Sequence, residues 1–242
     1  VSECVLRDCP EWGIVVEGGG AVIRDNLLFT CGTVAKNNLP GAIAGDGGGD
    51  CSHNTVIGAR VNGLLFTYPW AEARFMDNIV AGGAKKGLHV HDPTPGWRFD
   101  YNLFFGVVMH AGVTEMDCAT LEDARRGSSS PLTKGTTMQT HGLDADPKFA
   151  DPAAGDGVLA PDSPARGAAS DGTDIGARVE AIAADRISAT DWIVRDIARR
   201  YAREGLAAAA KGDAGKASAL LKKARLLRPE EPGVRELEGR LK

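Results

Sequence analysis

Four ionisable residues in the first half of the chain have the types and spacing that acid–base chemistry needs. His89, His91 and Asp92 lie within one short stretch, and Asp46 lies in a similar glycine-led stretch before them. Histidine can act as a general base near neutral pH, and glycoside hydrolysis uses paired carboxylates. If Asp46 and Asp92 end strands two turns apart in a stacked structure, about 9.6 Å separates them along the axis, which suits an inverting pair. These four residues are the candidate catalytic groups.

Aromatic and basic side chains near this group would suit a sugar ligand. The candidates for substrate binding are Tyr68, Trp70, Trp97, Lys85, Lys86 and Arg98. Aromatic rings offer flat faces on which sugar rings stack, and cations can neutralise an acidic sugar. Two alternatives stay open. The ionisable residues can be ordinary solvated side chains on a sheet face, and each Trp can instead fold over the protein wall.

The elements that must position these residues form a repeat. Glycines recur at intervals of 28, 22 and 24 residues, and asparagines at intervals of 28, 24 and 24. The glycines are Gly13, Gly41, Gly63 and Gly87, and the asparagines are Asn26, Asn54, Asn78 and Asn102. Two markers that keep the same order with a period near two dozen indicate a solenoid.

Short apolar segments follow both markers, including GIVVEG, GLLFTY, DNIVA and YNLFF. They are strand-length, rich in Val, Ile and Phe, and bounded by turn residues. No helix of useful length fits between them, which argues against a leucine-rich repeat. We therefore predict a parallel β-helix whose turns stack about 4.8 Å apart. At that spacing the asparagine amides can bond from one turn to the next.

Alternation along the glycine-led strands predicts which side chains point outwards. One outward column contains Val15, Ile43, Leu65 and His89, and the next contains Glu17, Gly45, Thr67 and His91. Gly18, Asp46, Tyr68 and Asp92 then lie at the strand ends. A slip of one residue in strand phase would turn the histidines inwards.

These turns resemble the right-handed parallel β-helix family of carbohydrate-active proteins, the pectate-lyase-like folds. A second resemblance is carried by Asp144-Ala-Asp-Pro-Lys-Phe149, Asp151-Pro152, Gly155-Asp156, Leu159-Ala-Pro161, Ser163-Pro-Ala165 and Asp174-Ile-Gly-Ala177. In this order they look like the closing segment of many secreted bacterial proteins of the family. The resemblance implies a mainly β, right-handed solenoid over residues 1–178. It also implies a carbohydrate ligand and a secreted, periplasmic or cell-surface location.

From about Val179 the composition changes to Ala, Arg, Leu and Glu, and residues 179–242 are predicted to form a small α-helical domain. Helices are expected at Arg195–Lys211, Ala214–Leu227 and Val234–Leu241. The positions of Tyr201, Gly205, Ala208, Ala217, Leu221, Ala224 and Pro229 resemble a tetratricopeptide repeat, with a departure at Glu204, where Leu is usual. Because one such repeat needs a neighbour to bury its face, this tail should dock on the solenoid, cap it or meet another protein.

Composition excludes some function classes. A net charge of −4 and a pI near 5.8 argue against a nucleic-acid partner, and no apolar run is long enough for a membrane span. The chain starts at Val1, inside the repeat, so we expect a longer protein with further N-terminal turns and a signal peptide outside this sequence.

The cysteines and isolated polar residues have simpler interpretations. Cys9 and Cys31 share a repeat position with Ala59 and Gly83, which indicates a ladder of small residues. The stretch Asp46-Gly-Gly-Gly-Asp50 reads as a turn; calcium ligation is the alternative, although two carboxylates fall short of the usual ligand number. We predict no metal site and no other cofactor. His141 is interpreted as a structural or surface residue.

Two functions remain in view. The first is an extracellular protein that binds or processes a polysaccharide on its outer strand face, with lyase or glycoside hydrolase chemistry. The alternative is a non-catalytic β-helix scaffold or adhesin whose helical tail binds a protein. Fold alone does not choose between them.

Overall fold

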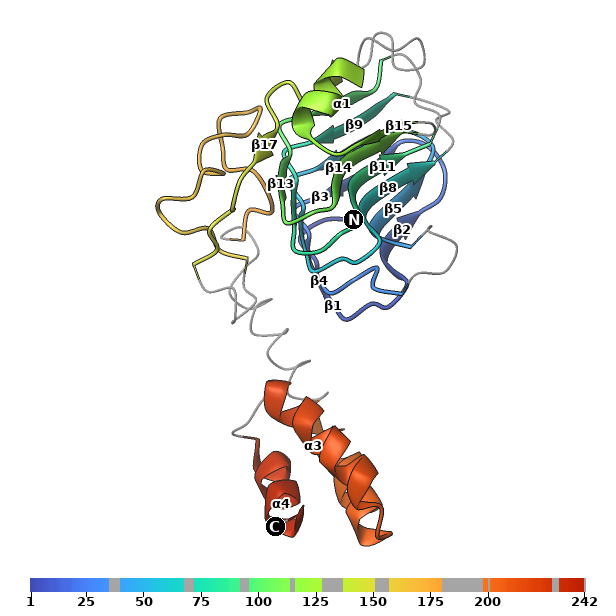
Figure 1. Cartoon of the computed structure of the whole chain (residues 1–242), viewed down its shortest axis with the longest axis vertical. Coiled ribbons are helices and arrows are strands. Elements are labelled where there is room, and N and C mark those ends of the chain that lie inside the picture. Colours follow the sequence, from blue (N-terminus) through green and yellow to red (C-terminus); the bar gives the residue numbers. More distant parts are fainter. Residues whose placement is uncertain are drawn as a thin grey trace. The chain divides into compact units, whose positions relative to one another are not determined.

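The structure is a computed structural model that describes residues 1–34, 40–67, 72–91, 96–113, 116–127, 137–150, 157–179, 198–199, 201–227 and 231–241. The chain divides into two compact units, Val1–Ile182 and Ala183–Lys242. The first is a parallel β-solenoid of about four turns, and the second is a small helical region (Figure 1). The predicted fold class is confirmed.

Three sheets form the walls of the solenoid, and each complete turn adds one strand to each of them. Sheet 1 contains β2 (Trp12–Val16), β5 (Gly41–Asp46), β8 (Asn62–Thr67), β11 (Lys86–Val90) and β14 (Met109–Val113), with β15 (Met116–Cys118) antiparallel to β14. Sheet 2 contains β3 (Ala21–Arg24), β6 (Gly49–Ser52), β9 (Ala73–Met76), β12 (Arg98–Asp100) and β16 (Thr137–Met138). Sheet 3 contains β1 (Val5–Arg7), β4 (Leu27–Phe29), β7 (Thr55–Ile57), β10 (Ile79–Ala81), β13 (Leu103–Phe105) and β17 (Leu143–Asp144).

The interior is a continuous stack of apolar side chains that the strands supply from alternate positions. Phe75 and Phe99, on neighbouring turns, stack with ring centroids 5.1 Å apart, and Trp97 packs 5.7 Å from each. Trp97 is 0% exposed. The prediction that it can meet a sugar ring is wrong, because alternation through Trp97, Arg98 and Phe99 turns both aromatic rings inwards.

A ladder of buried amides runs along one corner of the solenoid, as the asparagine spacing predicted. Asn26, Asn54 and Asn78 each donate a side-chain N–H to the side-chain oxygen of the asparagine one turn further on, at 2.9–3.0 Å. The same oxygen also accepts the backbone N–H of the preceding asparagine. All four asparagines are 0% exposed. Their polar groups are satisfied within the protein, which makes a buried polar corner tolerable.

The residue before each ladder asparagine turns the chain between sheets 2 and 3. Asp25, His53, Asp77 and Tyr101 all have positive φ, between 52° and 61°. This left-handed conformation is uncommon for residues with a side chain. It places four side chains in a second column on the outside of the corner, where later parts of the chain bind them.

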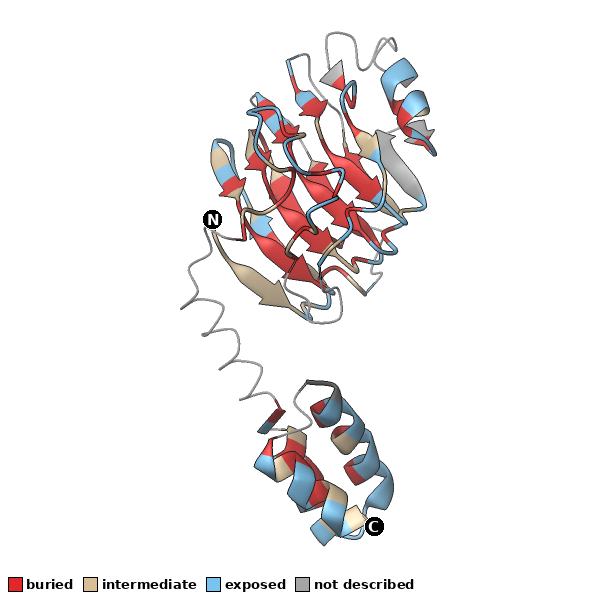
Figure 2. Ribbon diagram, turned by 90° about the vertical axis from the view of Figure 1, so that its left-hand side faces the viewer, coloured by how far each residue is buried: buried red, intermediate tan, exposed pale blue. Residues whose placement is uncertain are grey.

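The outer face of sheet 3 is apolar and is covered by residues 145–150 and 157–179, here called the closing segment. Ile79, Ala81 and Leu103 pack against Leu159 and Ile175 of that segment. Leu27 and Phe29 pack against Val179. Figure 2, seen from this side, shows largely buried strands behind the loops of the segment. The Asp-Ile-Gly-Ala motif thus has a packing role.

Gly176 fixes the route of the closing segment over the sheet. Its φ is +95°, and its N–H donates to the Asp77 carbonyl at 2.8 Å. A Cβ at this position would lie 2.6 Å from Thr55 Oγ1 and 2.7 Å from Ile79 Cδ1. Only glycine satisfies both the turn and the close approach.

A short helix, α1 (Leu121–Gly127), packs at the last turn of the solenoid. Thr120 caps it: the Thr120 hydroxyl accepts the Asp123 N–H, and the Asp123 carboxylate accepts the Thr120 N–H. Arg125 donates to the carbonyls of Gln139 and Gly142, which ties the helix to the following strand connection.

The second unit contains helical residues 201–210, α3 (Ala214–Leu227) and α4 (Pro232–Leu241). Small residues allow close packing: Ala202 and Ala224 meet Val234, and Ala208 and Ala217 meet Leu237. The helices predicted at Ala214–Leu227 and Val234–Leu241 are confirmed. Most of residues 195–200 lies outside the described residues. Among the helices that are described, none combines the length and apolar character needed to cross a membrane.

Candidate functional site

Two pockets lie on the outer faces of the solenoid that the closing segment leaves uncovered. One has a volume of about 320 Å³ and lies on sheet 1. The other, about 650 Å³, lies on sheet 2. Both combine ionisable side chains with flatter apolar surface, as sites for small ligands and glycans do.

The strand register places the predicted catalytic residues differently from the expected columns. Asp46 pairs with Thr67, not Tyr68, and Ala44 rather than Ile43 pairs with Leu65. The second turn is therefore shifted by one residue. Asp46 ends β5, as predicted, but it is aligned with Thr67 and not with Tyr68, so this carboxylate belongs to the column of Thr67.

The corrected column brings four polar side chains together, one from each turn. Glu17 follows the pairing of Val16 with Gly45, so it lies beside Asp46, and His91 follows the end of β11, so it lies beside Thr67. The Thr67 hydroxyl donates to Asp46 Oδ1 at 3.4 Å. All four residues line the sheet 1 pocket. This set, Glu17–Asp46–Thr67–His91, is called the sheet 1 column below.

The chemistry of the sheet 1 column is that of acid–base groups at an open surface. Neighbouring strands are about 4.8 Å apart, so Glu17 and Asp46 can approach the separation of a retaining carboxylate pair. Nε2 of His91 is buried and has no hydrogen-bond partner among the described residues, so a ligand must enter the pocket to meet this nitrogen as a base. Trp12 lines the same pocket. Glu17 was placed in an outward column by sequence but was not chosen as a site residue.

His89 lies in the neighbouring outward column of sheet 1, as predicted, next to Leu65. It is only 8% exposed. Its ring lies 4.5 Å from the ring of His91, centroid to centroid. His89 therefore packs against the ring of His91. Because it is nearly buried, it is a weaker candidate than His91 for direct contact with a large ligand.

The other predicted residues divide among several places. Tyr68, Trp70 and Asp92 lie outside the described residues. Lys85 is exposed and Lys86 is half-buried at the start of β11. Arg98 is exposed on the outer face of sheet 2 and lines the larger pocket. The candidate set is thus spread over more than one wall of the solenoid.

The sheet 2 pocket is lined by Glu72, Arg74, Met76, Gly96, Arg98, Asp100 and Tyr101. Arg74 and Arg98 are paired in register, and both are exposed. The arginine predicted by sequence therefore has a second arginine one turn away.

A carboxylate–histidine pair adjoins this pocket. Asp100, 4% exposed, accepts the backbone N–H of His141 at 2.6 Å and faces its Nδ1 at 2.8 Å. The imidazole stacks on Tyr101, with centroids 4.5 Å apart and planes 15° apart. His141, interpreted from sequence as a structural or surface residue, has a side chain that is 56% exposed and paired with the Asp100 carboxylate. A separation of 41 residues concealed the pair, because the distant strand β17 brings His141 back to the corner.

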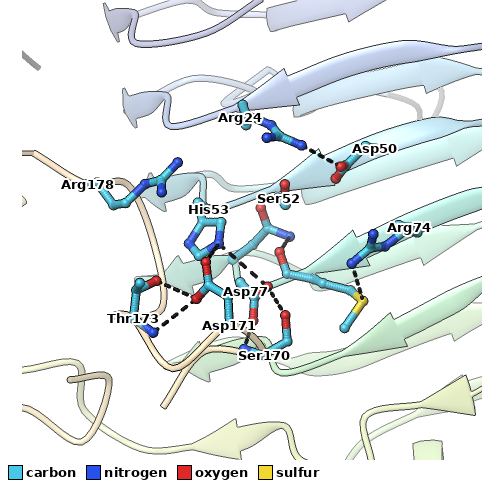
Figure 3. A network of polar contacts seen from close by, with 12 residues as sticks. Arg24, Asp50, Ser52, His53, Arg74, Asp77, Ser170, Asp171, Thr173 and Arg178 are labelled. Atoms are coloured by element: carbon cyan, nitrogen blue, oxygen red, sulfur yellow. Dashed lines mark hydrogen bonds and ion pairs between the residues drawn. The ribbon is translucent and has the colours of Figure 1, made fainter. Parts of the chain in front are cut away.

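A third polar cluster joins the closing segment to the corner column (Figure 3). His53 Nε2 lies 3.7 Å from Asp77 and 3.5 Å from Asp171. The Asp77 carboxylate accepts the N–H and hydroxyl of Ser170, both at 2.6 Å. His53 and Asp77 are buried, whereas Ser170 and Asp171 are exposed. Because the contacts join the corner to the closing segment, we assign this cluster to docking of that segment.

Arg178 completes this docking through a two-point ion pair with Asp25, at 2.8 and 2.6 Å. The hydrogen bond to Asp25 raises the pKa of Arg178 above its ordinary value. A hydrogen bond from the Thr173 hydroxyl lowers the pKa of Asp171. These shifts stabilise the charged forms that the docking uses.

The cysteines and the glycine-rich turn are structural. Cys31 and Ala59 are buried in the predicted small-residue ladder, and burial raises the pKa of the Cys31 thiol to about 12. Within the stretch Asp46–Asp50, Gly47 and Gly48 form the turn between β5 and β6, and Gly47 has a φ of +88°. Asp50, already in β6, pairs with Arg24 at 2.6 Å. Over the described residues, no group of three or more His, Cys, Asp or Glu is arranged to hold a metal ion.

No protein-family model, curated protein or solved structure matches the chain. The sheet 1 column and the sheet 2 pocket are therefore described from the structure alone.

Proposed function

We propose that the solenoid binds and processes a polysaccharide along the outer face of sheet 1. The observation that carries this proposal is the sheet 1 column, in which four successive turns present Glu17, Asp46, Thr67 and His91 to one pocket. A linear glycan lying along the axis can meet all four, because the turns repeat about every 4.8 Å.

The reaction we favour is hydrolysis by the two carboxylates. Glu17 and Asp46 occupy neighbouring turns, and a close carboxylate pair can act as acid and nucleophile on a glycosidic bond. His91 offers the competing chemistry: its buried Nε2 has no partner among the described residues, and it can remove a proton in an elimination from an acidic sugar that enters the pocket. The two reactions leave different products, so one assay separates them.

The wider resemblance belongs to the same proposal. The β-solenoid and its closing segment support membership of the pectate-lyase-like proteins and action outside the cytoplasm. The helical unit, with small residues at Ala202, Gly205 and Ala217, supports a tetratricopeptide-like tail that binds a protein. Under this division of labour, removing Ala183–Lys242 should leave glycan binding unchanged.

The test is a screen of the protein against neutral glycans and polyuronides. New reducing ends would report any cleavage, and ultraviolet absorbance of an unsaturated product would report elimination. Glu17→Gln and Asp46→Asn should each lower hydrolysis by about a hundredfold or more, because each removes an acid–base group. Glu122→Gln, on the exposed side of α1, is the matched control and should retain full activity.

Three outcomes would redirect the proposal. Elimination that disappears in His91→Gln would assign a lyase. Glycan binding without cleavage, lost in the column variants, would leave a binding protein. If the protein neither bound nor cleaved any glycan, the polysaccharide proposal would fail and the scaffold function would replace it.

A further inference from the structure

The outer face of sheet 2 carries two neighbouring arginines whose charges are not neutralised within the described residues. Arg74 and Arg98 are paired in register on β9 and β12. The Arg74 guanidinium makes a 3.7 Å contact with the sulfur of Met76 (Figure 3), and neither arginine forms an ion pair among the residues that the structure describes. Like charges directly opposite each other destabilise a sheet. An anionic ligand would remove this repulsion.

The acidic side chains near the two arginines do not pair with them in the described part of the chain. Asp50, one turn before Arg74, binds Arg24 through Oδ2 at 2.6 Å, and its buried Oδ1 has no hydrogen-bond partner among the described residues. Asp100 Oδ1 accepts the backbone N–H groups of His141 and Tyr101, and Asp100 Oδ2 pairs with Nδ1 of His141. Glu72 lines the pocket but pairs with neither arginine in the described part of the chain. The two guanidinium groups thus remain available to a ligand.

The pocket is much larger than a single oxyanion. Its volume is about 650 Å³. Tyr101 and the buried Asp100 belong to its lining, and the His141 ring, just outside that lining, stacks on Tyr101 and pairs with Asp100. A site of this shape can bind an anionic group at the arginines and a flat organic body against the rings.

Charge and geometry narrow the ligand class. The guanidinium-bearing strands are about 4.8 Å apart. One arginine can occupy both oxygens of a carboxylate, whereas a phosphate or sulfate ester has three terminal oxygens and can bridge two arginines. Glu72 and Asp100 also line the pocket and would repel a polyanion. The residues therefore favour one tetrahedral oxyanion on an otherwise neutral molecule.

We propose that sheet 2 carries a binding site for a small phosphate or sulfate monoester, with Arg74 and Arg98 binding the oxyanion and the Tyr101–His141 ring pair contacting the rest of the ligand. This site lies on a different wall from the sheet 1 column and does not depend on the proposed glycan function. Glycan binding can fail while this proposal holds, and the reverse is equally true.

The experiment is calorimetric titration of the whole chain with phenyl phosphate, phenyl sulfate and benzoate. One or both esters should bind more tightly than benzoate, and the stronger ester identifies the source of the oxyanion. Arg74→Gln and Arg98→Gln should each weaken ester binding by about tenfold or more, the effect of losing charged hydrogen bonds. Arg60→Gln makes the same charge change at an exposed residue outside the pocket lining and should leave the affinity unchanged.

His141→Ala tests the second half of the site. Wild-type protein should bind phenyl phosphate more tightly than inorganic phosphate, and the variant should lose that difference while still binding inorganic phosphate. Failure of the wild type to bind either ester, equal binding of benzoate, or full affinity in both arginine variants would overturn the oxyanion site. Retention of the phenyl preference in His141→Ala would overturn the role of the ring pair. Unfolding curves of each variant confirm that the fold is intact.

Discussion

Replacing Asn78 by alanine should destabilise the solenoid more than most single substitutions. The Asn78 side chain accepts the backbone and side-chain N–H groups of Asn54, both at 3.0 Å. It donates to the carbonyls of Cys51 and Met76 and to Asn102 Oδ1, each at 2.9 Å. The two N–H groups of the amide are shared among these three acceptors. About four full hydrogen bonds at about 1 kcal/mol each give a loss of about 4 kcal/mol, because the abandoned groups are buried and cannot all find new partners.

The end of the same ladder provides the matched control. Asn26 accepts the Cys4 N–H and donates to the carbonyls of Val1 and Arg24 and to Asn54 Oδ1. Val1 is 56% exposed and Cys4 is half-buried, so water can replace two of these bonds. Asn26→Ala should therefore lower the free energy of unfolding by only about 2 kcal/mol.

Urea unfolding measures both variants. The variants are compared in a Trp192→Phe background, which removes the tryptophan of the second unit, so that fluorescence reports on the solenoid through the buried Trp97. Far-ultraviolet circular dichroism would follow the helical unit in parallel, so that separate transitions are recognised. A loss below about 1 kcal/mol for Asn78→Ala would refute the reasoning, because several unpaired buried groups must have a larger effect. Equal losses for Asn78→Ala and Asn26→Ala would also refute it.

Three further predictions test other parts of the structure. The thiol of Cys31, with a pKa raised by burial to about 12, should resist iodoacetamide at pH 8 in the folded protein, while the half-buried Cys4 reacts; mass spectrometry of the labelled peptides measures both. Gly176→Ala should lower stability by about 2 kcal/mol or more, through its positive φ and the close approach of sheet 3, and limited proteolysis should then cut the closing segment faster. The lowered pKa of Asp171 means that its contribution to stability is present above the ordinary aspartate pKa and is lost as pH falls through the lowered value. Unfolding at a series of acidic pH values should show this loss in the wild type and a smaller one in Thr173→Ala.

The asparagine ladder and the solenoid could be predicted from sequence because both repeat. Asn54, Asn78 and Asn102 keep intervals of 24 residues, and the interval defines which amides stack. The alignment of the second turn with its neighbours could not be predicted in the same way. Gly41–Asp46 consists mostly of small residues that fit either face, so alternation carries no signal there, and the actual pairing had to come from the register.

The composition of the two pockets was harder to predict for a different reason. Trp97 and Arg98 are neighbours in sequence, and both were predicted to bind a ligand. Side chains alternate along the strand, so the conformation that exposes Arg98 buries Trp97. The pairing of Asp100 with His141 crosses the irregular residues after β15, where no repeat fixes the alignment. Contacts between the repeat and the closing segment require three-dimensional information.

The amide ladder also gives the solenoid a direction. Every side-chain link from Asn26 to Asn102 runs the same way, with the N–H pointing to the later turn, and Asn102 continues it towards Gln139 at 3.4 Å. Aligned amides polarise one another, so each bond strengthens its neighbours, by about 10–30% in condensed-phase estimates. A break in the middle therefore divides one polarised chain into two shorter ones, whereas a break at the end only shortens it. The corner behaves electrically as a single aligned dipole that begins at the Cys4 N–H and grows with each turn.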